Sequence, residues 1–297
     1  MLFGTALSAR PVVLDGGLAT RLEARGHDLS DALWSARLLL DDPDEIRATH
    51  ADFFAAGAEV ATTASYQVSE SGFLAAGRDR AEAREALRRS VRLAREAAER
   101  FAGPRWVAAS VGPYGATLAD GSEYRGDYGL SVAELRAWHR PRLAILAEAG
   151  ADLLACETIP SLAETEALAL EFAALGVPAW ISLTTVGDRT RLGEPASEAY
   201  AIAAEVPEVV ALGANCCDPR EAAAVVAAVD GRRPVLFYPN SGEAWDAGAR
   251  RWRGTPVVGV GAARTWAAAG VRGLGGCCRV SPDQIAAISG QVDGLGR

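Results

Sequence analysis

The stretch Val271-Arg272-Gly273-Leu274-Gly275-Gly276-Cys277-Cys278-Arg279 runs from an apolar segment through two glycines into two adjacent cysteines. Adjacent side chains on a strand point to opposite faces, so both sulfur atoms can reach one ion only where the backbone leaves strand geometry. Glycine permits such a turn. We therefore interpret Cys277 and Cys278 as two ligands of a zinc ion, placed where a buried strand ends.

A third ligand is needed, because a catalytic zinc site has three protein ligands and a fourth position open to substrate. The segment Gly213-Ala214-Asn215-Cys216-Cys217 also follows an apolar run and offers one. Strand alternation allows only one of Cys216 and Cys217 to face the ion and does not decide which. A buried cysteine can equally be a small hydrophobic residue, but two such clusters at strand ends favour a metal site.

The two cysteine clusters follow two of eight short apolar segments that alternate with helical patterns. The predicted strands are 11–14, 59–64, 106–111, 152–155, 178–183, 209–212, 234–237 and 271–274. Helical patterns cover 44–57, 80–101 and 132–149, and a further helix has Ser161 as N-cap and ends at Gly176. This alternation, without a linker, predicts an α/β fold and a single (β/α)8 TIM-type barrel domain over residues 1–297, with an open doubly wound sheet as the alternative.

In a barrel, the carboxyl ends of the strands open at one mouth, where active sites are built. Cys216 follows the sixth predicted strand and Cys277 the eighth, so only one strand separates them. Glu157 follows the fourth strand, and the turn Asp15-Gly16-Gly17 follows the first. A carboxylate and closely approaching backbone N–H groups suit the charged ends of an amino acid. The alternatives are an ordinary surface carboxylate for Glu157 and a tight turn without a ligand for Asp15 and Gly16.

The composition excludes several classes of protein. All thirty basic residues are arginine, whereas Schiff-base aldolases, pyridoxal-phosphate enzymes and Walker-type phosphate loops each need a lysine. The three histidines lie far apart, which argues against a histidine-rich zinc hydrolase. A formal net charge of -8, with acidic residues interspersed among the arginines, argues against nucleic-acid binding.

The sequence also lacks an apolar run of the roughly 20 residues that span a bilayer, and it lacks a signal-peptide pattern. Five cysteines, four of them in two adjacent pairs, do not form a disulfide framework. We therefore expect a cytoplasmic chain, monomer or homo-oligomer, whose partners are small molecules rather than nucleic acid or membrane.

These motifs resemble the homocysteine S-methyltransferase family, which carries a G-x-N-C segment and a terminal G-G-C-C-R segment around zinc. Both stand here, at 213–216 and 275–279, and the resemblance covers nearly the whole chain. Further matching segments are 15–20, 33–36, 64–67, 112–115, 120–126 and 238–243. The compact form of this chain, with its loop 118–128, resembles the branch of the family that uses S-methylmethionine or S-adenosylmethionine as methyl donor rather than betaine or a folate.

The resemblance implies a zinc-dependent methyltransferase that moves a methyl group from a sulfonium donor to the thiol of L-homocysteine and yields methionine. It assigns Cys216, with Cys277 and Cys278, to the zinc, and leaves Cys217 as an additional thiol. It also supports pairing of Glu157 with the substrate ammonium. Three thiolates leave the site negatively charged, which attracts a cationic donor and suits thiolate alkylation better than hydrolysis.

Four further residues complete the expected substrate region. Asn215 is expected to orient the Cys216 loop. Tyr66, Tyr114 and Tyr238 offer ring faces to a sulfonium, with ordinary aromatic packing as the alternative for each. Competing functions are a methyltransferase acting on selenocysteine or another thiol, a non-catalytic zinc-binding barrel, and a vicinal-thiol redox protein. The redox interpretation is the weaker, because the chain lacks a C-x-x-C motif.

Overall fold

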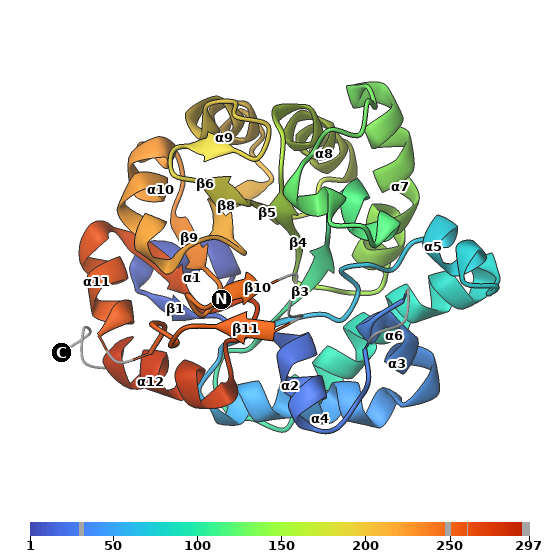
Figure 1. Cartoon of the computed structure of the whole chain (residues 1–297), viewed down its shortest axis with the longest axis horizontal. Coiled ribbons are helices and arrows are strands. Elements are labelled where there is room, and N and C mark those ends of the chain that lie inside the picture. The colour runs from blue at the N-terminus through green and yellow to red at the C-terminus, as the bar shows by residue number, and fades with distance from the viewer. Residues whose placement is uncertain (30–32, 247–250, 260, 293–297) are drawn as a thin grey trace.

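The computed structural model describes residues 1–29, 33–246, 251–259 and 261–292. Eight parallel strands form one sheet in the order β1-β12-β9-β8-β5-β4-β3-β2, surrounded by helices (Figure 1). The strands are β1 (Val12–Val13), β2 (Val60–Thr62), β3 (Trp106–Val111), β4 (Leu153–Ile159), β5 (Ala179–Leu183), β8 (Val209–Asn215), β9 (Val235–Tyr238) and β12 (Val271–Leu274). All eight predicted strands are present and follow the chain around the sheet, which confirms the (β/α)8 barrel.

The two edge strands, β1 and β2, meet partly through side chains. Glu59 N donates to Val13 O at 2.8 Å, and Val13 N donates to the Glu59 carboxylate at 3.2 Å. Closer to the mouth, Thr62 N of β2 donates to Asp15 Oδ2 at 2.6 Å. These bonds join the first and second strands, as a barrel requires and an open doubly wound sheet does not.

Most of the helices cover the outside of the sheet. The helices are α1 (Phe3–Ala9), α2 (Leu18–Ala24), α3 (Ser35–Asp41), α4 (Pro43–Ala55), α5 (Glu70–Ala75), α6 (Arg80–Ala98), α7 (Val132–Glu148), α8 (Leu162–Leu175), α9 (Ala196–Ala204), α10 (Ala222–Val229), α11 (Ala262–Ala269) and α12 (Pro282–Val292). The four predicted helices agree with α4, α6, α7 and α8. Ser161 Oγ caps α8 by accepting from Glu164 N, and Gly176 ends it with a φ of 65°.

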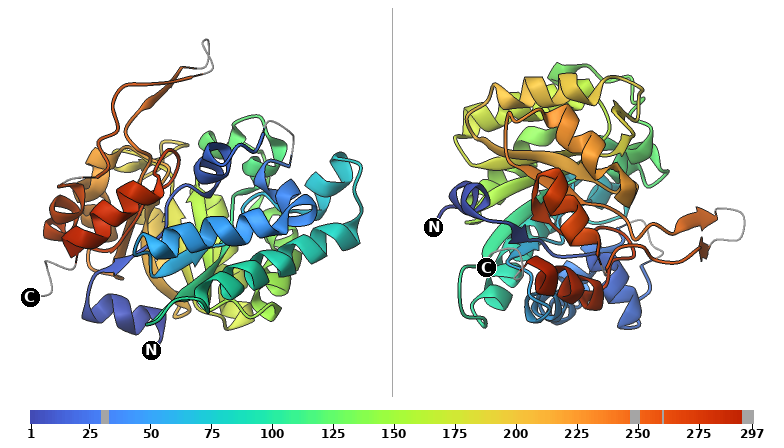
Figure 2. Two further views of the ribbon diagram at one scale, coloured as in Figure 1. Left: turned by 90° about the horizontal axis from the view of Figure 1, so that it is seen from below. Right: turned by 90° about the vertical axis from the view of Figure 1, so that its left-hand side faces the viewer.

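Short elements lie in the loops between strands and helices. They are the 3-10 turns η1 (Tyr114–Leu118), η2 (Ser122–Tyr124) and η3 (Pro219–Glu221), and the strand pairs β6 (Thr185–Val186) with β7 (Arg189–Thr190) and β10 (Ala244–Asp246) with β11 (Arg251–Arg253). The pair β10 and β11 projects away from the barrel body (Figure 2). Among the described residues, no helix has both the length and the apolar character needed to cross a membrane.

The barrel interior has its own apolar cluster, separate from the larger core between sheet and helices. Helix α1, which the sequence analysis did not predict, contributes Phe3 to this cluster. Its ring lies 5.7 Å from that of Trp106 and 5.6 Å from that of Trp180. Because Trp106 and Trp180 stand near the starts of their strands, α1 packs at the amino-terminal end of the barrel. The polar residues therefore gather at the opposite mouth.

Strands β4 and β8 run further than predicted. Cys156 and Glu157 lie inside β4, and Asn215 is the last residue of β8, whereas the sequence placed all three in loops. Both strands are buried along nearly their whole length. The polar side chains at their ends are consequently held by rigid strands at the mouth.

Candidate active site

Three cysteine sulfur atoms meet at the barrel mouth. The Sγ atoms of Cys216, Cys277 and Cys278 lie within 4.8 Å of one another. Cys216 and Cys277 form a disulfide, with Cα atoms 5.6 Å apart. A tetrahedral ion with metal–sulfur bonds of about 2.3 Å spaces its sulfur ligands by about 3.8 Å, so the reduced trio fits a thiolate-bound metal.

The backbone decides which of the two neighbouring cysteines joins this cluster. Cys216 directly follows β8 and has a φ of 48°, in the left-handed region that few non-glycine residues adopt. The turn separates the two side chains, and Cys217 is buried in the core between sheet and helices. Its thiol lies beside Thr185 and Glu221, and burial raises its pKa. Cys217 is therefore not a member of the sulfur cluster.

The loop that carries Cys277 and Cys278 is tightly packed, as its glycines suggest. A Cβ atom at Gly276 would lie 2.2 Å from Cγ1 of Val280. Cys277 N donates to Pro239 O at 2.8 Å, which ties the loop to the end of β9. Burial raises the pKa of the Cys278 thiol to about 11, so without a positive partner this thiol stays protonated at neutral pH.

Asn215 links the cluster to the end of β4. Its side chain accepts from Thr158 N at 2.7 Å and donates to Thr158 Oγ1 at 2.8 Å. The same amide group donates to Cys277 Sγ at 3.9 Å. Thr158 has a φ of 62°, a strained conformation for a β-branched residue that Asn215 holds in place. Asn215 is thus placed to orient Thr158 and Cys277. Its role in orienting the Cys216 loop stays a prediction.

Two buried carboxylates, Asp15 and Glu157, share the mouth. Asp15 accepts from the backbone N and the hydroxyl of Thr62, at 2.6 and 2.7 Å. Glu157 accepts hydrogen bonds from the hydroxyls of Ser110 and Tyr238. Burial raises the pKa of each carboxyl to about 7, and the negative charge of Glu157 contributes to the shift of Asp15. A cation bound between them would favour the ionised form of both.

The turn after Asp15 is occupied by protein contacts. Gly17 N donates to Val280 O at 2.9 Å, so the prediction that this N–H group holds a substrate carboxylate is wrong. A Cβ at Gly16 would lie 2.6 Å from Val280 O, and one at Gly17 would lie 2.6 Å from Cys277 O. The glycines therefore allow the turn to pack against the cysteine loop. Substrate binding by Gly16 stays a prediction.

The three predicted tyrosines have different surroundings. Tyr66 hydrogen-bonds Thr158 and lies within electrostatic range of Glu157, so it faces the mouth. The Tyr238 hydroxyl accepts from Trp180 Nε1 at 3.0 Å and packs in the barrel interior.

Tyr114 lies on the α7 side of the barrel, where its ring is 5.3 Å from that of Tyr128 and 5.2 Å from that of Trp138. Aromatic packing accounts for Tyr114, whereas Tyr66 faces the mouth and the Tyr238 hydroxyl reaches it through Glu157. Substrate binding by the three tyrosines stays a prediction.

Sequence reasoning missed two residues of η2, Glu123 and Tyr124. The Tyr124 hydroxyl is in hydrogen-bonding contact with the Cys278 thiol, and its ring lies 5.4 Å from the Arg191 guanidinium. Arg191 in turn donates to Cys216 O at 3.3 Å. The only signal in the sequence is the family resemblance of the segment 120–126, which is otherwise as rich in polar residues as an ordinary loop.

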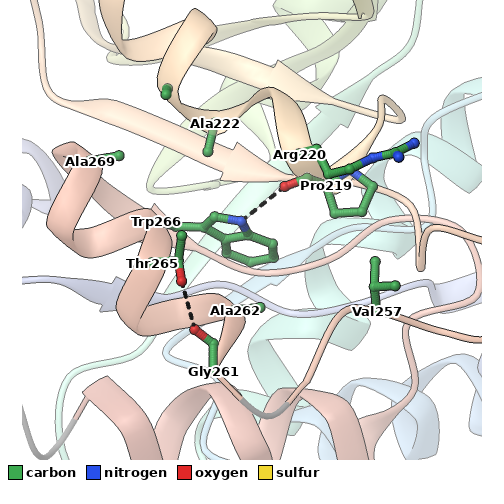
Figure 3. A pocket seen from close by; sticks show the side chains of 10 residues that line it. Pro219, Arg220, Ala222, Val257, Gly261, Ala262, Thr265, Trp266 and Ala269 are labelled. Carbon is green, nitrogen blue, oxygen red and sulfur yellow. Dashed lines mark hydrogen bonds between the residues drawn. The ribbon is translucent and has the colours of Figure 1, made fainter.

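A separate cavity of about 370 Å³ lies between α10 and α11 (Figure 3). It is lined by Pro219, Arg220, Ala222, Ala223, Val257, Gly261, Ala262, Thr265, Trp266 and Ala269. None of the three clustered cysteines lines it, and neither does Asp15 or Glu157. The chemistry at the barrel mouth is therefore outside this cavity.

Comparison with known proteins agrees with this geometry. A family model described as homocysteine S-methyltransferase matches residues 12–292. The chain belongs to the homocysteine S-methyltransferase family. It is 47% identical to the homocysteine S-methyltransferase of Escherichia coli K12 over 294 residues, which cover 93% of this chain and 94% of the relative. It is also 42% identical to a selenocysteine Se-methyltransferase of Brassica oleracea over 93% of this chain and 87% of the relative.

Solved structures of the family superpose closely on the chain. Crystal structures of the homocysteine methyltransferase MmuM from Escherichia coli, in metallated and oxidized forms, share 44% sequence identity with it. Their TM-scores are 0.83 and 0.84, and each comparison covers 95% of this chain and 96% of the other. The fold of this chain is thus shared with a relative of which a metallated form has been solved.

Proposed function

We propose that this chain is a zinc-dependent methyltransferase that moves a methyl group from a sulfonium donor to the thiol of L-homocysteine and produces methionine. The donor is S-methylmethionine or S-adenosylmethionine. The observation that carries the proposal is the meeting of three cysteine sulfur atoms, within 4.8 Å of one another, at the mouth of a barrel that also holds two buried carboxylates.

The metal proposed is zinc, held by Cys216, Cys277 and Cys278. Thiolates are ligands that zinc prefers and that magnesium and calcium do not. Bound there, zinc supplies deprotonation of an incoming thiol, which at a pKa near 8.5 is otherwise mostly protonated at neutral pH. The donation from Asn215 to Cys277 Sγ favours the charged form of that sulfur and fixes its direction. Cysteines kept as thiols suit a reducing compartment such as the cytoplasm.

The carboxylates Asp15 and Glu157 hold the ammonium of homocysteine. Both are buried, and hydrogen bonds from Thr62, Ser110 and Tyr238 fix their orientation. Because their pKa values of about 7 place them at the edge of ionisation, a bound ammonium makes both fully ionised and gains two charge-assisted contacts. The amino acid is then anchored with its side chain directed toward the cysteines.

Methyl transfer is a direct displacement. The homocysteine sulfur attacks the methyl carbon, the new sulfur–carbon bond forms as the bond to the donor sulfur breaks, and the electron pair stays on the donor sulfur. With S-methylmethionine both products are methionine. The residues of the chain contribute by aligning the two sulfur atoms and the methyl carbon, which in favourable systems lowers a barrier by about 7–11 kcal/mol.

The test is to incubate zinc-loaded protein and homocysteine separately with S-methylmethionine, S-adenosylmethionine and betaine, and to measure methionine. We expect methionine with a sulfonium donor and none with betaine. No methionine at full zinc loading, or methionine from betaine alone, contradicts the proposal. Selenocysteine should be compared as acceptor, because one relative is a selenocysteine Se-methyltransferase. If kcat/KM is higher for selenocysteine than for homocysteine, selenocysteine is the preferred methyl acceptor, and the proposed methyl transfer from a sulfonium donor still holds.

A further inference from the structure

The carboxylate of Glu123 is buried at the mouth without a partner. The residue is 9% exposed, and its Oε2 atom has no hydrogen-bond partner within the described residues. It belongs to η2, which contacts β4, the strand that carries Glu157. Burying a carboxylate without a counter-charge is costly, and burial raises the pKa of Glu123 accordingly. A bound cation would remove that cost.

The basic side chain that acts on Glu123 does not neutralise it. Arg125 lowers the pKa of Glu123 slightly, but its side chain is 51% exposed and pairs with Asp120 at 3.5 Å and with Asp127 at 3.4 Å. The charge of Asp120 acts in the opposite direction and raises the pKa of Glu123. Solvent and two other carboxylates thus already satisfy Arg125, and none of the described residues gives the buried Oε2 atom of Glu123 a hydrogen-bond partner.

Three tyrosines and the Cys278 thiol lie within electrostatic range of this carboxylate. Its charge acts on the hydroxyls of Tyr66, Tyr124 and Tyr128. A Cβ built on Gly115 would lie 2.6 Å from both Glu123 N and a ring carbon of Tyr128, which shows how closely that ring packs on η2. Tyr124 reaches the Cys278 thiol, and the charge of Glu123 also acts on that thiol.

A buried carboxylate with tyrosines close to it is suited to a cation that cannot donate hydrogen bonds. A sulfonium is such a cation, because it is recognised by charge and by the faces of aromatic rings. The ammonium of an amino acid instead favours hydrogen-bond acceptors such as Asp15 and Glu157. The mouth therefore contains two different negative sites, and the one with Glu123 is joined to Cys278 through Tyr124.

We propose that Glu123, together with Tyr66 and Tyr124, holds the sulfonium centre of the methyl donor beside Cys278. This inference rests on the proposed function, because it assumes a sulfonium donor and an acceptor sulfur at the cysteine cluster. The placement puts the donor sulfur on the side of the cluster from which its methyl group can face the acceptor. It also favours product release, since methyl transfer turns the cation into a neutral thioether that Glu123 no longer attracts.

The experiment compares Glu123→Gln with Asp127→Asn in zinc-loaded protein. Both variants remove one negative charge from the same loop, but Asp127 is exposed. The binding of S-methylmethionine is compared with that of 2-amino-5-methylhexanoate, in which an uncharged carbon replaces the sulfonium sulfur and the ammonium is kept. The ratio of the two dissociation constants isolates recognition of the sulfonium charge. Homocysteine KM and zinc content are measured in parallel.

We expect Glu123→Gln to reduce the preference for S-methylmethionine over its neutral analogue about tenfold or more, the size of a lost charge-assisted contact, with homocysteine KM and zinc content unchanged. Asp127→Asn should leave the preference as in the wild type. An unchanged preference in Glu123→Gln, or equal weakening of both compounds, overturns the proposal.

Two additional measurements keep the inference testable and separate it from the proposed function. If Glu123→Gln does not fold, Glu123→Asp, which keeps the charge on a shorter side chain, should retain most of the preference that Glu123→Met loses. Equal preferences in these two variants overturn the proposal. A wild-type protein that makes no methionine refutes the proposed function instead, whereas an active wild type with an unchanged Glu123→Gln refutes only the role of Glu123.

Discussion

Replacing Glu157 by Gln removes one negative charge from the barrel mouth and hardly changes the size of the side chain. Glu157 is 8% exposed, and burial raises its pKa from 4.5 to about 7. The native protein therefore binds this proton more tightly than the unfolded chain does. Between pH 4.5 and 7 the free energy of unfolding must fall as the pH rises, because ionisation is easier in the unfolded chain.

The size of this loss of stability follows from the pKa shift of Glu157. A difference of about 2.5 pKa units, at 1.36 kcal/mol per unit, corresponds to about 3 kcal/mol of lost stability above pH 7. Gln is never ionised and can still accept the hydrogen bond from Ser110. We therefore expect Glu157→Gln to raise the free energy of unfolding of the ligand-free protein by about 1–3 kcal/mol at pH 8, and to have almost no effect at pH 4.

The same substitution should weaken substrate binding. Loss of a hydrogen bond to a charged group costs about 1.5–3 kcal/mol, so homocysteine KM should rise about 10- to 100-fold while zinc content stays the same. Wild-type KM should itself rise as the pH falls below 7, because Asp15 and Glu157 then become protonated. Urea unfolding at the two pH values and steady-state kinetics measure both effects.

Glu171 provides the control for the stability measurement. It is also buried, but Arg136 and Arg140 pair with it and lower its pKa. Glu171→Gln should therefore destabilise the protein at pH 8, the opposite of Glu157→Gln. Equal destabilisation by Glu157→Gln at both pH values, together with an unchanged homocysteine KM, would show that Glu157 has a structural role and does not bind the ammonium.

Three further outcomes are expected. Cys278→Ala should lose bound zinc, whereas Cys217→Ala should retain it, as elemental analysis of the purified variants will show; the reverse pattern refutes the ligand assignment. Gly213→Ala should destabilise the fold by about 3 kcal/mol, because the added Cβ would lie 1.9 Å from Leu236 O, while Gly290→Ala, with open space around it, should not lower Tm. Treatment with a zinc chelator should abolish methyl transfer and added zinc should restore it, with far-ultraviolet circular dichroism unchanged; activity that survives complete zinc removal contradicts the account.

The fold could be predicted from sequence because each strand is a short apolar run. All eight runs became strands, since residues buried on both faces cannot be replaced by polar ones without loss of the core. Strand ends were harder to predict. Glu157, Thr158 and Asn215 look like loop residues, yet they extend β4 and β8. Thr158 and Asn215 hydrogen-bond each other across the mouth, and Glu157 accepts from Ser110 and Tyr238. Helix α1 was missed because it is seven residues long and has no capping side chain.

The candidate site could be predicted only in part, because the tertiary fold decides which side chains reach it. Cys216 and Cys217 are equivalent in any pattern, and only the φ of 48° at Cys216 separates them in the structure. The family resemblance was needed to choose between them. Tyr66 and Tyr114 were likewise indistinguishable, because whether a ring faces a substrate or another ring depends on contacts far along the chain. Glu123 gave no signal because its burial comes from the tertiary fold.

The central claim is that Cys216, Cys277 and Cys278 hold a zinc ion whose fourth position takes the homocysteine sulfur. X-ray absorption at the zinc edge, on reduced protein with one zinc per chain, tests it directly. The account predicts three sulfur neighbours and one lighter atom without homocysteine, and four sulfur neighbours after homocysteine is added. A lighter fourth neighbour that persists at saturating homocysteine, or fewer than three protein sulfurs, would contradict it.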